Sequence, residues 1–115
     1  MVLTNVYGAA LTIRASVTAL RESRGHLLLT GSVAGRKAVP GSLYSSTKWA
    51  VTAMSEAARQ ELHGSGVRVT TICPGFIATD MTKKNPYTMP FLIGADDAAR
   101  RPSVTCGGTV RPCPA

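Results

Sequence analysis

The sequence lacks the features that define several common classes of protein. It has only three cysteines in 115 residues, and none forms the Cys-x-x-Cys pair that indicates a zinc or redox centre. No apolar run reaches the roughly 18 residues that a membrane-spanning helix needs. The N-terminus shows no signal-peptide pattern. We therefore expect a soluble, cytoplasmic protein with reduced thiols, no bound metal and no membrane contact.

The charge is basic but dispersed. Lysine and arginine total 13 against 6 acidic residues, which gives a net charge of +7. Proteins that bind nucleic acid usually gather basic residues on one element with aromatic side chains between them, whereas aromatic residues make up only 5% of this chain. We expect no nucleic-acid partner, and anion binding through the net charge remains a minor alternative. The closest approaches to a cluster are the pairs Arg36-Lys37, Lys83-Lys84 and Arg100-Arg101.

The length and an apolar content of 44% allow one small domain with a modest core. A first helix is predicted at residues 6–20, where apolar residues recur at spacings of three and four. Asn5 stands near its start and Gly25 just beyond its end, where a cap and a stop are expected. The apolar positions are Val6, Ala9, Ala10, Ile13, Val17 and Leu20.

Two short apolar runs on either side of a longer helical segment predict a βαβ unit. The run HLLLTGS at residues 26–32 indicates a strand covered on both faces, and VRVTTIC at residues 67–73 is rich in β-branched residues. Between them, glycine and proline at residues 33–43 indicate a loop, and residues 43–63 have the periodicity of a helix. Such units make their two strands parallel neighbours. The predicted fold class is therefore α/β.

Beyond the stretch CPGFIATDM the periodicity fades. The stretch GADDAARR at residues 94–101 is compatible with a short helix that Pro102 halts. The following stretch, PSVTCGGTVRPCPA, has three prolines and two glycines and no periodicity. We expect residues 102–115 to be coil.

Tyr44 and Lys48, in the stretch YSSTK, share one face of the second predicted helix because they are four residues apart. This helix starts beside the carboxyl end of the first strand, where open α/β sheets bind ligands. An ammonium beside a phenol favours the phenolate, so the pair suits proton transfer near neutral pH. Ser32 closes the first strand, and we expect it to be close enough to share a substrate oxygen with Tyr44. Each residue also has an ordinary interpretation: a chance helix pair, a turn serine and, for Asn5, a helix-start residue.

Together, Asn5, Ser32 in TGSVAG, the YSSTK pair and CPGFIATDM resemble the short-chain dehydrogenase/reductase family, in that order and at that spacing, over residues 1–101. The resemblance implies a partial Rossmann-like, doubly wound parallel sheet. It also implies four catalytic roles. Tyr44 is the general acid/base, and Lys48 activates it and holds the nicotinamide ribose. Ser32 orients the substrate carbonyl, and Asn5 supports a water-linked proton relay to the lysine.

The resemblance further implies an NAD or NADP cofactor and a small-molecule alcohol or carbonyl substrate. Pro74-Gly75 corresponds to the turn that lets the backbone approach the nicotinamide, although alone it is an ordinary turn. Ile77 aligns with a position whose backbone meets the carboxamide, and Thr79 with the threonine that contacts it. The implied cofactor-binding residues are Tyr44, Lys48, Pro74, Gly75, Ile77 and Thr79. In this family the two long helices commonly form a dimer interface, so we expect a homo-oligomer.

The sequence departs from the family at both ends. Family members carry a Gly-rich turn after their first strand, which is the phosphate-binding device of dinucleotide sites, and this sequence has none. We therefore expect a truncated chain: residues 1–101 form the C-terminal catalytic part of an NAD(P)-dependent oxidoreductase, with little activity alone, and residues 102–115 form an irregular tail. The alternative is a non-catalytic interaction fragment that pairs through its two apolar helices.

Overall fold

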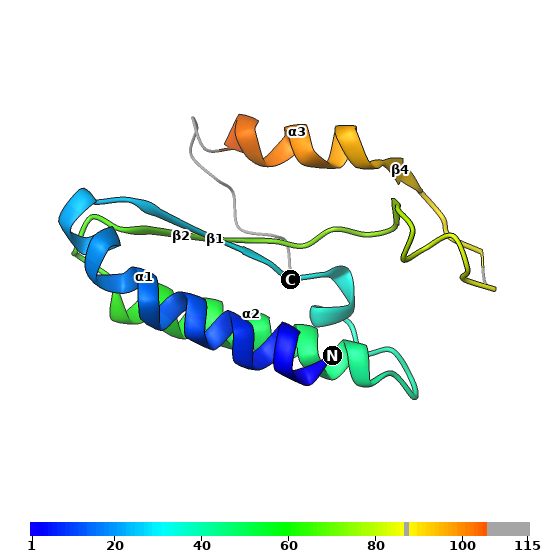
Figure 1. Ribbon diagram of the computed structural model, residues 1–115, viewed down its shortest axis with the longest axis horizontal. Helices are drawn as coiled ribbons and strands as arrows, with labels where there is room; N and C mark the ends of the chain where they lie inside the picture. The colour runs from blue at the N-terminus through cyan, green and yellow to red at the C-terminus, as the bar shows by residue number, and fades with distance from the viewer. Residues whose placement is uncertain (87, 106–115) are drawn as a thin grey trace. The chain divides into compact units, whose positions relative to one another are not determined.

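The computed structural model describes residues 1–86 and 88–105, which fall into two compact units (Figure 1). The first unit is Met1–Cys73, and the second begins at Pro74. In chain order the first contains the π-helical segment η1 (Leu3–Gly8), α1 (Ala9–Ser23), β1 (His26–Thr30), the 3-10 turn η2 (Val33–Gly35), α2 (Leu43–Glu61) and β2 (Arg68–Ile72). The second contains β3 (Ile77–Ala78), β4 (Ile93–Gly94) and α3 (Ala95–Thr105).

The N-terminal helix begins earlier than predicted. η1 continues directly into α1, so Asn5 lies inside a helical stretch, and its interpretation as a helix-start residue is wrong. The Asn5 amide already donates to the Met1 carbonyl over 2.8 Å. α1 ends where Arg24 adopts a left-handed conformation with φ 51°, and the amides of Arg24 and Gly25 both donate to the Leu20 carbonyl. The helix therefore ends three residues later than the predicted Leu20, and Gly25 lies just beyond its end, as predicted.

β1 and β2 form the predicted parallel pair, in register over all five residues of each strand. Along β1, Leu27 and Leu29 are buried, Leu28 is half-buried and Thr30 is exposed. This alternation is typical of a strand with one covered face. Among the described residues of the first unit, α1 and α2 lie on the same side of the pair (Figure 1). The prediction of a strand covered on both faces is therefore wrong for this part of the chain.

α2 begins and ends for local reasons. Its N-cap, Ser42, accepts a hydrogen bond from the Ser45 amide through its side chain over 3.2 Å. After its last turn, Gly64 and Gly66 take positive φ values of 79° and 84°, which glycine tolerates best. The predicted helix at residues 43–63 is thus confirmed, with its end two residues earlier. The core consists of Leu27, Leu29, Val51 and Ala58, with Ala9, Ile13, Leu20, Met54 and Val69 partly buried around it.

The second unit contains elements that the sequence patterns did not predict. β3 and β4 form a parallel pair of two residues each. α3 starts with Asp96 and Asp97 in its first turn, where acidic side chains complement the helix dipole. It continues through Pro102 to its end at Thr105, so the predictions that Pro102 halts the helix and that residues 102–105 are coil are wrong. Because proline has no backbone N–H, a helix that contains it lacks one hydrogen bond, but the fixed φ of proline is itself helical. The rest of the predicted coil, residues 106–115, lies outside the described residues.

Candidate active site

Tyr44 and Lys48 occupy the first two turns of α2, next to the carboxyl end of β1. Lys48 Nζ lies 5.7 Å from the centroid of the Tyr44 ring and donates a hydrogen bond to the Thr30 carbonyl over 2.9 Å. Both side chains are half-buried, and burial lowers the pKa of the Lys48 ammonium. The prediction that Tyr44 and Lys48 share one face of the helix is therefore confirmed. The carbonyl of Thr30, the last residue of β1, holds the end of the lysine side chain.

Ser32 lies at the same end of β1. Gly31 continues the strand pairing, because its amide donates to the Ile72 carbonyl over 2.7 Å, and Ser32 follows in extended conformation. The side chain of Ser32 is buried, and its Oγ accepts a hydrogen bond from the Ala34 amide over 3.1 Å. The bond makes Ser32 the N-cap of η2, which matches the capping interpretation. It does not exclude a second role, because the hydroxyl still has its own proton to donate.

Asn5 reaches the same helix from η1. Its Nδ2 donates to Thr47 Oγ1 over 3.0 Å, and Thr47 Oγ1 donates in turn to the Tyr44 carbonyl over 2.8 Å. Thr47 is only 2% exposed. The structure therefore brings Asn5, Ser32, Tyr44 and Lys48 into the first unit, around the start of α2 and the end of β1. A π-helical segment at Asn5 is itself notable, since such segments are rare and occur often at functional sites.

The other four predicted residues belong to the second unit. Pro74 and Gly75 follow β2 after Cys73, and a Cβ built on Gly75 would meet no heavy atom of the described residues within 4 Å. Ile77 lies in β3 and pairs with Ile93. Thr79 is exposed at a turn: its amide donates to Thr82 Oγ1 over 3.0 Å, and its carbonyl accepts from the Thr82 and Lys83 amides.

Sequence reasoning missed two residues around this site, Ser45 and Thr47. Both are buried in the first two turns of α2, and each makes a side-chain hydrogen bond to a backbone carbonyl. The signal for them was present in YSSTK, where three small hydroxyl residues separate the tyrosine from the lysine. Ser45, one residue after Tyr44, faces a different direction and contacts a neighbouring element, whereas Thr47, three residues on, lies near the Tyr44 face and donates back to the Tyr44 carbonyl.

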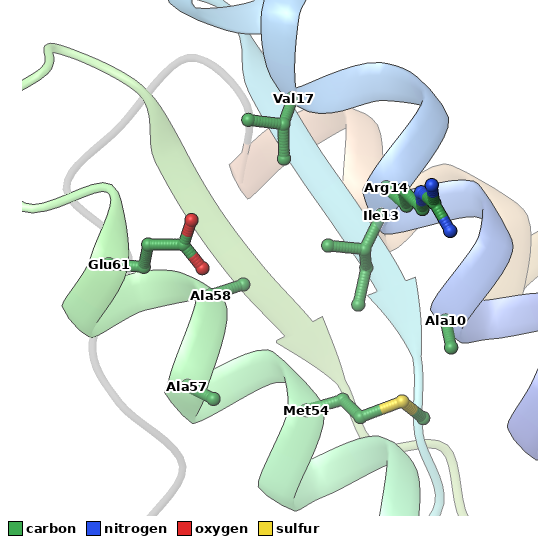
Figure 2. A pocket seen from close by; sticks show the side chains of 8 residues that line it. All are labelled: Ala10, Ile13, Arg14, Val17, Met54, Ala57, Ala58 and Glu61. Atoms are coloured by element: carbon green, nitrogen blue, oxygen red, sulfur yellow. The ribbon is translucent and has the colours of Figure 1, made fainter.

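A separate groove runs between α1 and α2 (Figure 2). Its volume is about 400 Å³, and Figure 2 shows Ile13 and Val17 of α1 directed toward Met54 and Ala58 of α2 across it. None of the four predicted catalytic residues lines it. The lining residues are Ala10, Ile13, Arg14, Val17, Met54, Ala57, Ala58 and Glu61.

The described residues lack two kinds of functional feature. Over residues 1–86 and 88–105, no helix combines the length and apolar character needed to cross a membrane. Within the same ranges, His, Cys, Asp and Glu side chains nowhere gather in a group of three or more that could hold a metal ion.

Comparison with known proteins identifies a family. The model of the short chain dehydrogenase family matches residues 1–89. An uncharacterized oxidoreductase of Myxococcus xanthus is 42% identical over 97 residues, which are 83% of this chain and 38% of that protein. A 3-oxoacyl-[acyl-carrier-protein] reductase of Bos taurus is 42% identical over 82 residues, 70% of this chain and 35% of that protein.

A solved structure shows the same fold. The crystal structure of a short chain dehydrogenase from Burkholderia cenocepacia, in complex with NADP, superimposes with a TM-score of 0.82 at 30% sequence identity. The match covers 92% of this chain and 45% of that one. The partial Rossmann-like α/β fold predicted from the sequence is therefore confirmed. The chain spans less than half the length of each of these three proteins.

Proposed function

The chain belongs to the short-chain dehydrogenase family, and we propose that it carries the catalytic residues of an NAD(P)-dependent oxidoreductase. The proposed reaction transfers a hydride between a nicotinamide cofactor and a small alcohol or carbonyl substrate. The observation that carries the proposal is the placement of Lys48 against the Tyr44 ring at the carboxyl end of β1, where Ser32 also lies. Ligands of open α/β sheets bind at that edge.

Tyr44 and Ser32 act on the substrate oxygen. In the reductive direction Tyr44 donates its phenolic proton to the carbonyl oxygen, and in the oxidative direction it takes the proton from the alcohol. Ser32 Oγ is already held by the Ala34 amide as an acceptor, so its own O–H is the group it offers to the same oxygen. A hydroxyl that is oriented in advance stabilises charge on that oxygen at little reorganisation cost.

Lys48 has three N–H donors and uses one on the Thr30 carbonyl. The other two are available for the ribose hydroxyls of a nicotinamide nucleotide and for hydrogen bonding toward Tyr44. Asn5 supports the start of α2 through Thr47, which uses one of the two N–H donors of its Nδ2, and its proposed part in a water-linked relay uses the second N–H or the amide oxygen.

A nicotinamide cofactor supplies the hydride when bound. The residues present suit the nicotinamide end: Lys48 offers ribose donors, and no heavy atom of the described residues lies within 4 Å of a Cβ built on Gly75, which leaves its backbone open to close approach within that part of the chain. We propose that Pro74, Gly75, Ile77 and Thr79 contact this end. The 115 residues contain no Gly-rich turn for the pyrophosphate. Affinity of this chain for NAD(H) or NADP(H) is therefore proposed to be weak.

The proposed substrate is taken from the name of a relative. The bovine protein is named a 3-oxoacyl-[acyl-carrier-protein] reductase, so a 3-oxoacyl thioester is the first substrate to test. The proteins from Myxococcus xanthus and Bos taurus are both named as oxidoreductase or reductase, and the comparisons give no support to the alternative of a non-catalytic interaction fragment. A cytoplasmic location is likewise part of the proposal.

The proposed homo-oligomer uses the face of α1 and α2. The groove between them is lined mostly by small and apolar side chains, with Arg14 of α1 and Glu61 of α2 beside it. A second copy placed with two-fold symmetry can bring each arginine to the partner's glutamate, as an isologous interface requires. Analytical ultracentrifugation tests this: a monomer at all concentrations excludes it, and a dimer that Ala57→Arg dissociates supports it.

Turnover is the test of the proposed function. The full chain is mixed with NADH or NADPH at saturating concentration and a 3-oxoacyl thioester, and the loss of reduced cofactor is followed by absorbance. The expected result is slow turnover that Tyr44→Phe removes. No oxidation with either cofactor, or oxidation that Tyr44→Phe leaves unchanged, contradicts the proposal.

A further inference from the structure

Ser45 follows the proposed acid/base but lies on another side of α2. Successive residues of an α-helix are about 100° apart around its axis, so Ser45 does not share the face of Tyr44 and Lys48. Its side chain is only 4% exposed. Ser45 Oγ donates to the Ala34 carbonyl over 2.6 Å and accepts from the Val39 amide over 3.2 Å. The hydroxyl therefore joins the first turn of α2 to the loop that follows β1.

Ala34 connects this serine to the other one. Its carbonyl accepts the hydrogen bond from Ser45 Oγ, and its amide donates the hydrogen bond to Ser32 Oγ. The two polar groups of one backbone residue thus bind two buried serines, one beside the proposed acid/base and one proposed to hold the substrate oxygen. A shift of the Ala34 backbone changes the geometry of the bond that orients Ser32.

Thr52 and Lys48 of α2 also pack closely against the turn Val33–Gly35, which contains Ala34. Thr52 Oγ1 donates to the Gly35 carbonyl over 3.0 Å, and a Cβ built on Gly35 would come within 2.5 Å of the Lys48 carbonyl oxygen. The turn Val33–Gly35 therefore lies directly on the part of α2 that carries Lys48. At the start of α2, next to Tyr44, the hydrogen bond from Ser45 Oγ to the Ala34 carbonyl holds the same turn.

We propose that Ser45 is a positioning residue: through the Ala34 backbone it sets the Ser32 hydroxyl relative to Tyr44. This inference rests on the proposed oxidoreductase function. Ser45→Ala removes the donor to Ala34 and the acceptor for Val39 without touching Tyr44, Lys48 or Ser32. The expected effect is a fall in kcat of about tenfold, because small misplacements of catalytic groups are costly, with the KM for the cofactor unchanged.

Two serines of α2 provide matched controls. Ser55→Ala removes a hydroxyl that is equally buried, at 4% exposure, but is bonded to Thr71 of β2, so it reports the general cost of losing a buried hydrogen bond. Ser46→Ala removes an exposed hydroxyl next to Ser45. Ser45→Thr keeps the hydroxyl and is expected to restore kcat at least in part. Equal losses of kcat in Ser45→Ala and Ser55→Ala overturn the proposal.

A second measurement does not depend on turnover. Amide hydrogen exchange, followed by NMR on the full chain, reports the Ala34 and Val39 amides directly. Ser45→Ala is expected to speed their exchange by about tenfold, whereas Ser55→Ala and Ser46→Ala leave both amides at wild-type rates. If the wild-type chain shows no turnover, the proposed function fails, and exchange decides the positioning role. Unchanged exchange in Ser45→Ala, or an equal rise in Ser55→Ala, overturns that role.

Discussion

Asn5 Nδ2 donates a hydrogen bond to Thr47 Oγ1 over 3.0 Å and so joins η1 to the first turns of α2, 42 residues further along the chain. Thr47 Oγ1 in turn donates a hydrogen bond to the Tyr44 carbonyl. Both capacities of the threonine hydroxyl, as acceptor and as donor, are used at a site that is almost fully buried. The backbone that carries the proposed acid/base is therefore held by a residue from a different helix.

This link predicts coupling between the two side chains. Asn5→Ala and Thr47→Val should each lower the free energy of unfolding by about 1 kcal/mol or more, because a buried hydrogen bond is lost. Combining them should cost less than the sum, with a coupling energy of roughly 0.5–3 kcal/mol as for residues in direct contact. Urea denaturation of the four proteins measures it. Additive losses would show that the contact contributes nothing to stability.

Tyr44→Phe tests the proposed acid/base. The change deletes only the phenolic oxygen, which makes no hydrogen bond that the fold requires among the contacts described above, so circular dichroism and the urea midpoint should stay at wild-type values. Turnover should fall by about 10²- to 10⁴-fold, the usual contribution of a general acid/base. Tyr7→Phe is the matched control, since Tyr7 is an exposed tyrosine of η1. A similar loss in both variants would contradict the assignment.

Gly35→Ala should destabilise the protein. The added Cβ would lie 2.5 Å from the Lys48 carbonyl oxygen and 3.0 Å from Thr52 Oγ1, and the first of these is backbone that cannot rotate away. Overpacking of this kind typically costs about 1–3 kcal/mol. Gly75→Ala is the control for stability, because its Cβ would enter open space among the described residues. Thermal unfolding compares the two variants, and equal midpoints would contradict the prediction.

The order of elements up to β2 was predictable because each has a strong local signal. The leucines at the centre of β1 and the β-branched residues of β2 mark strands, and Gly64 and Gly66 mark the end of α2. The candidate site was predictable for the same reason, since Tyr44 and Lys48 are brought together by the helix alone. The predicted pairing of β1 with β2 needed only the general rule for βαβ units.

The remaining features depend on contacts between distant residues. β3 and β4 are two residues each, too short for a periodic pattern, and they are defined only by pairing across 15 residues between Ile77 and Ile93. Pro102 misled the prediction because its cost to a helix is a single hydrogen bond and local crowding, which the rest of α3 can absorb. Ser45 and Thr47 were not predicted because the sequence does not show which groups their hydroxyls bind.

His26 predicts a pH dependence of stability. Its Nε2 lies 2.8 Å from Thr70 Oγ1, and burial, followed by the charge of Arg68, lowers the pKa of the imidazole below its ordinary value. The unfolded chain takes up a proton near pH 6.5, as histidine normally does, while the folded chain resists it. The unfolded state thus binds more protons below that pH, so the free energy of unfolding should fall as the pH drops from neutral to about 5.

Urea denaturation across this pH range checks the effect of His26. His26→Gln should flatten the profile, because the titrating ring is gone while a donor for Thr70 remains. His63→Gln is the control, since His63 is exposed beyond the end of α2. A wild-type profile that is flat between neutral pH and about pH 5, or one that His63→Gln flattens instead, would refute the role of His26.

Lys48→Met separates the charge of the lysine from its side-chain length. Methionine keeps an unbranched side chain but loses the donor to the Thr30 carbonyl and the ammonium beside the Tyr44 ring. Because hydrogen bonds from a charged group typically contribute 1.5–3 kcal/mol, affinity for NADH or NADPH should fall roughly ten- to hundredfold. Turnover should fall with it, while Lys37→Met, which removes an exposed lysine, should change neither.

The pH dependence of cofactor affinity distinguishes a charge effect from a packing effect at Lys48. Burial lowers the pKa of this ammonium, so it should lose its proton at a lower pH than an ordinary lysine, whose pKa is about 10.4. In the wild-type chain, affinity should therefore decline as the pH rises through the lowered pKa of Lys48. In Lys48→Met this decline should be absent, because no charge is left to lose. If calorimetric titrations gave the same alkaline decline in both proteins, the ammonium would not be the group that holds the cofactor, and the role proposed for Lys48 would pass to another donor.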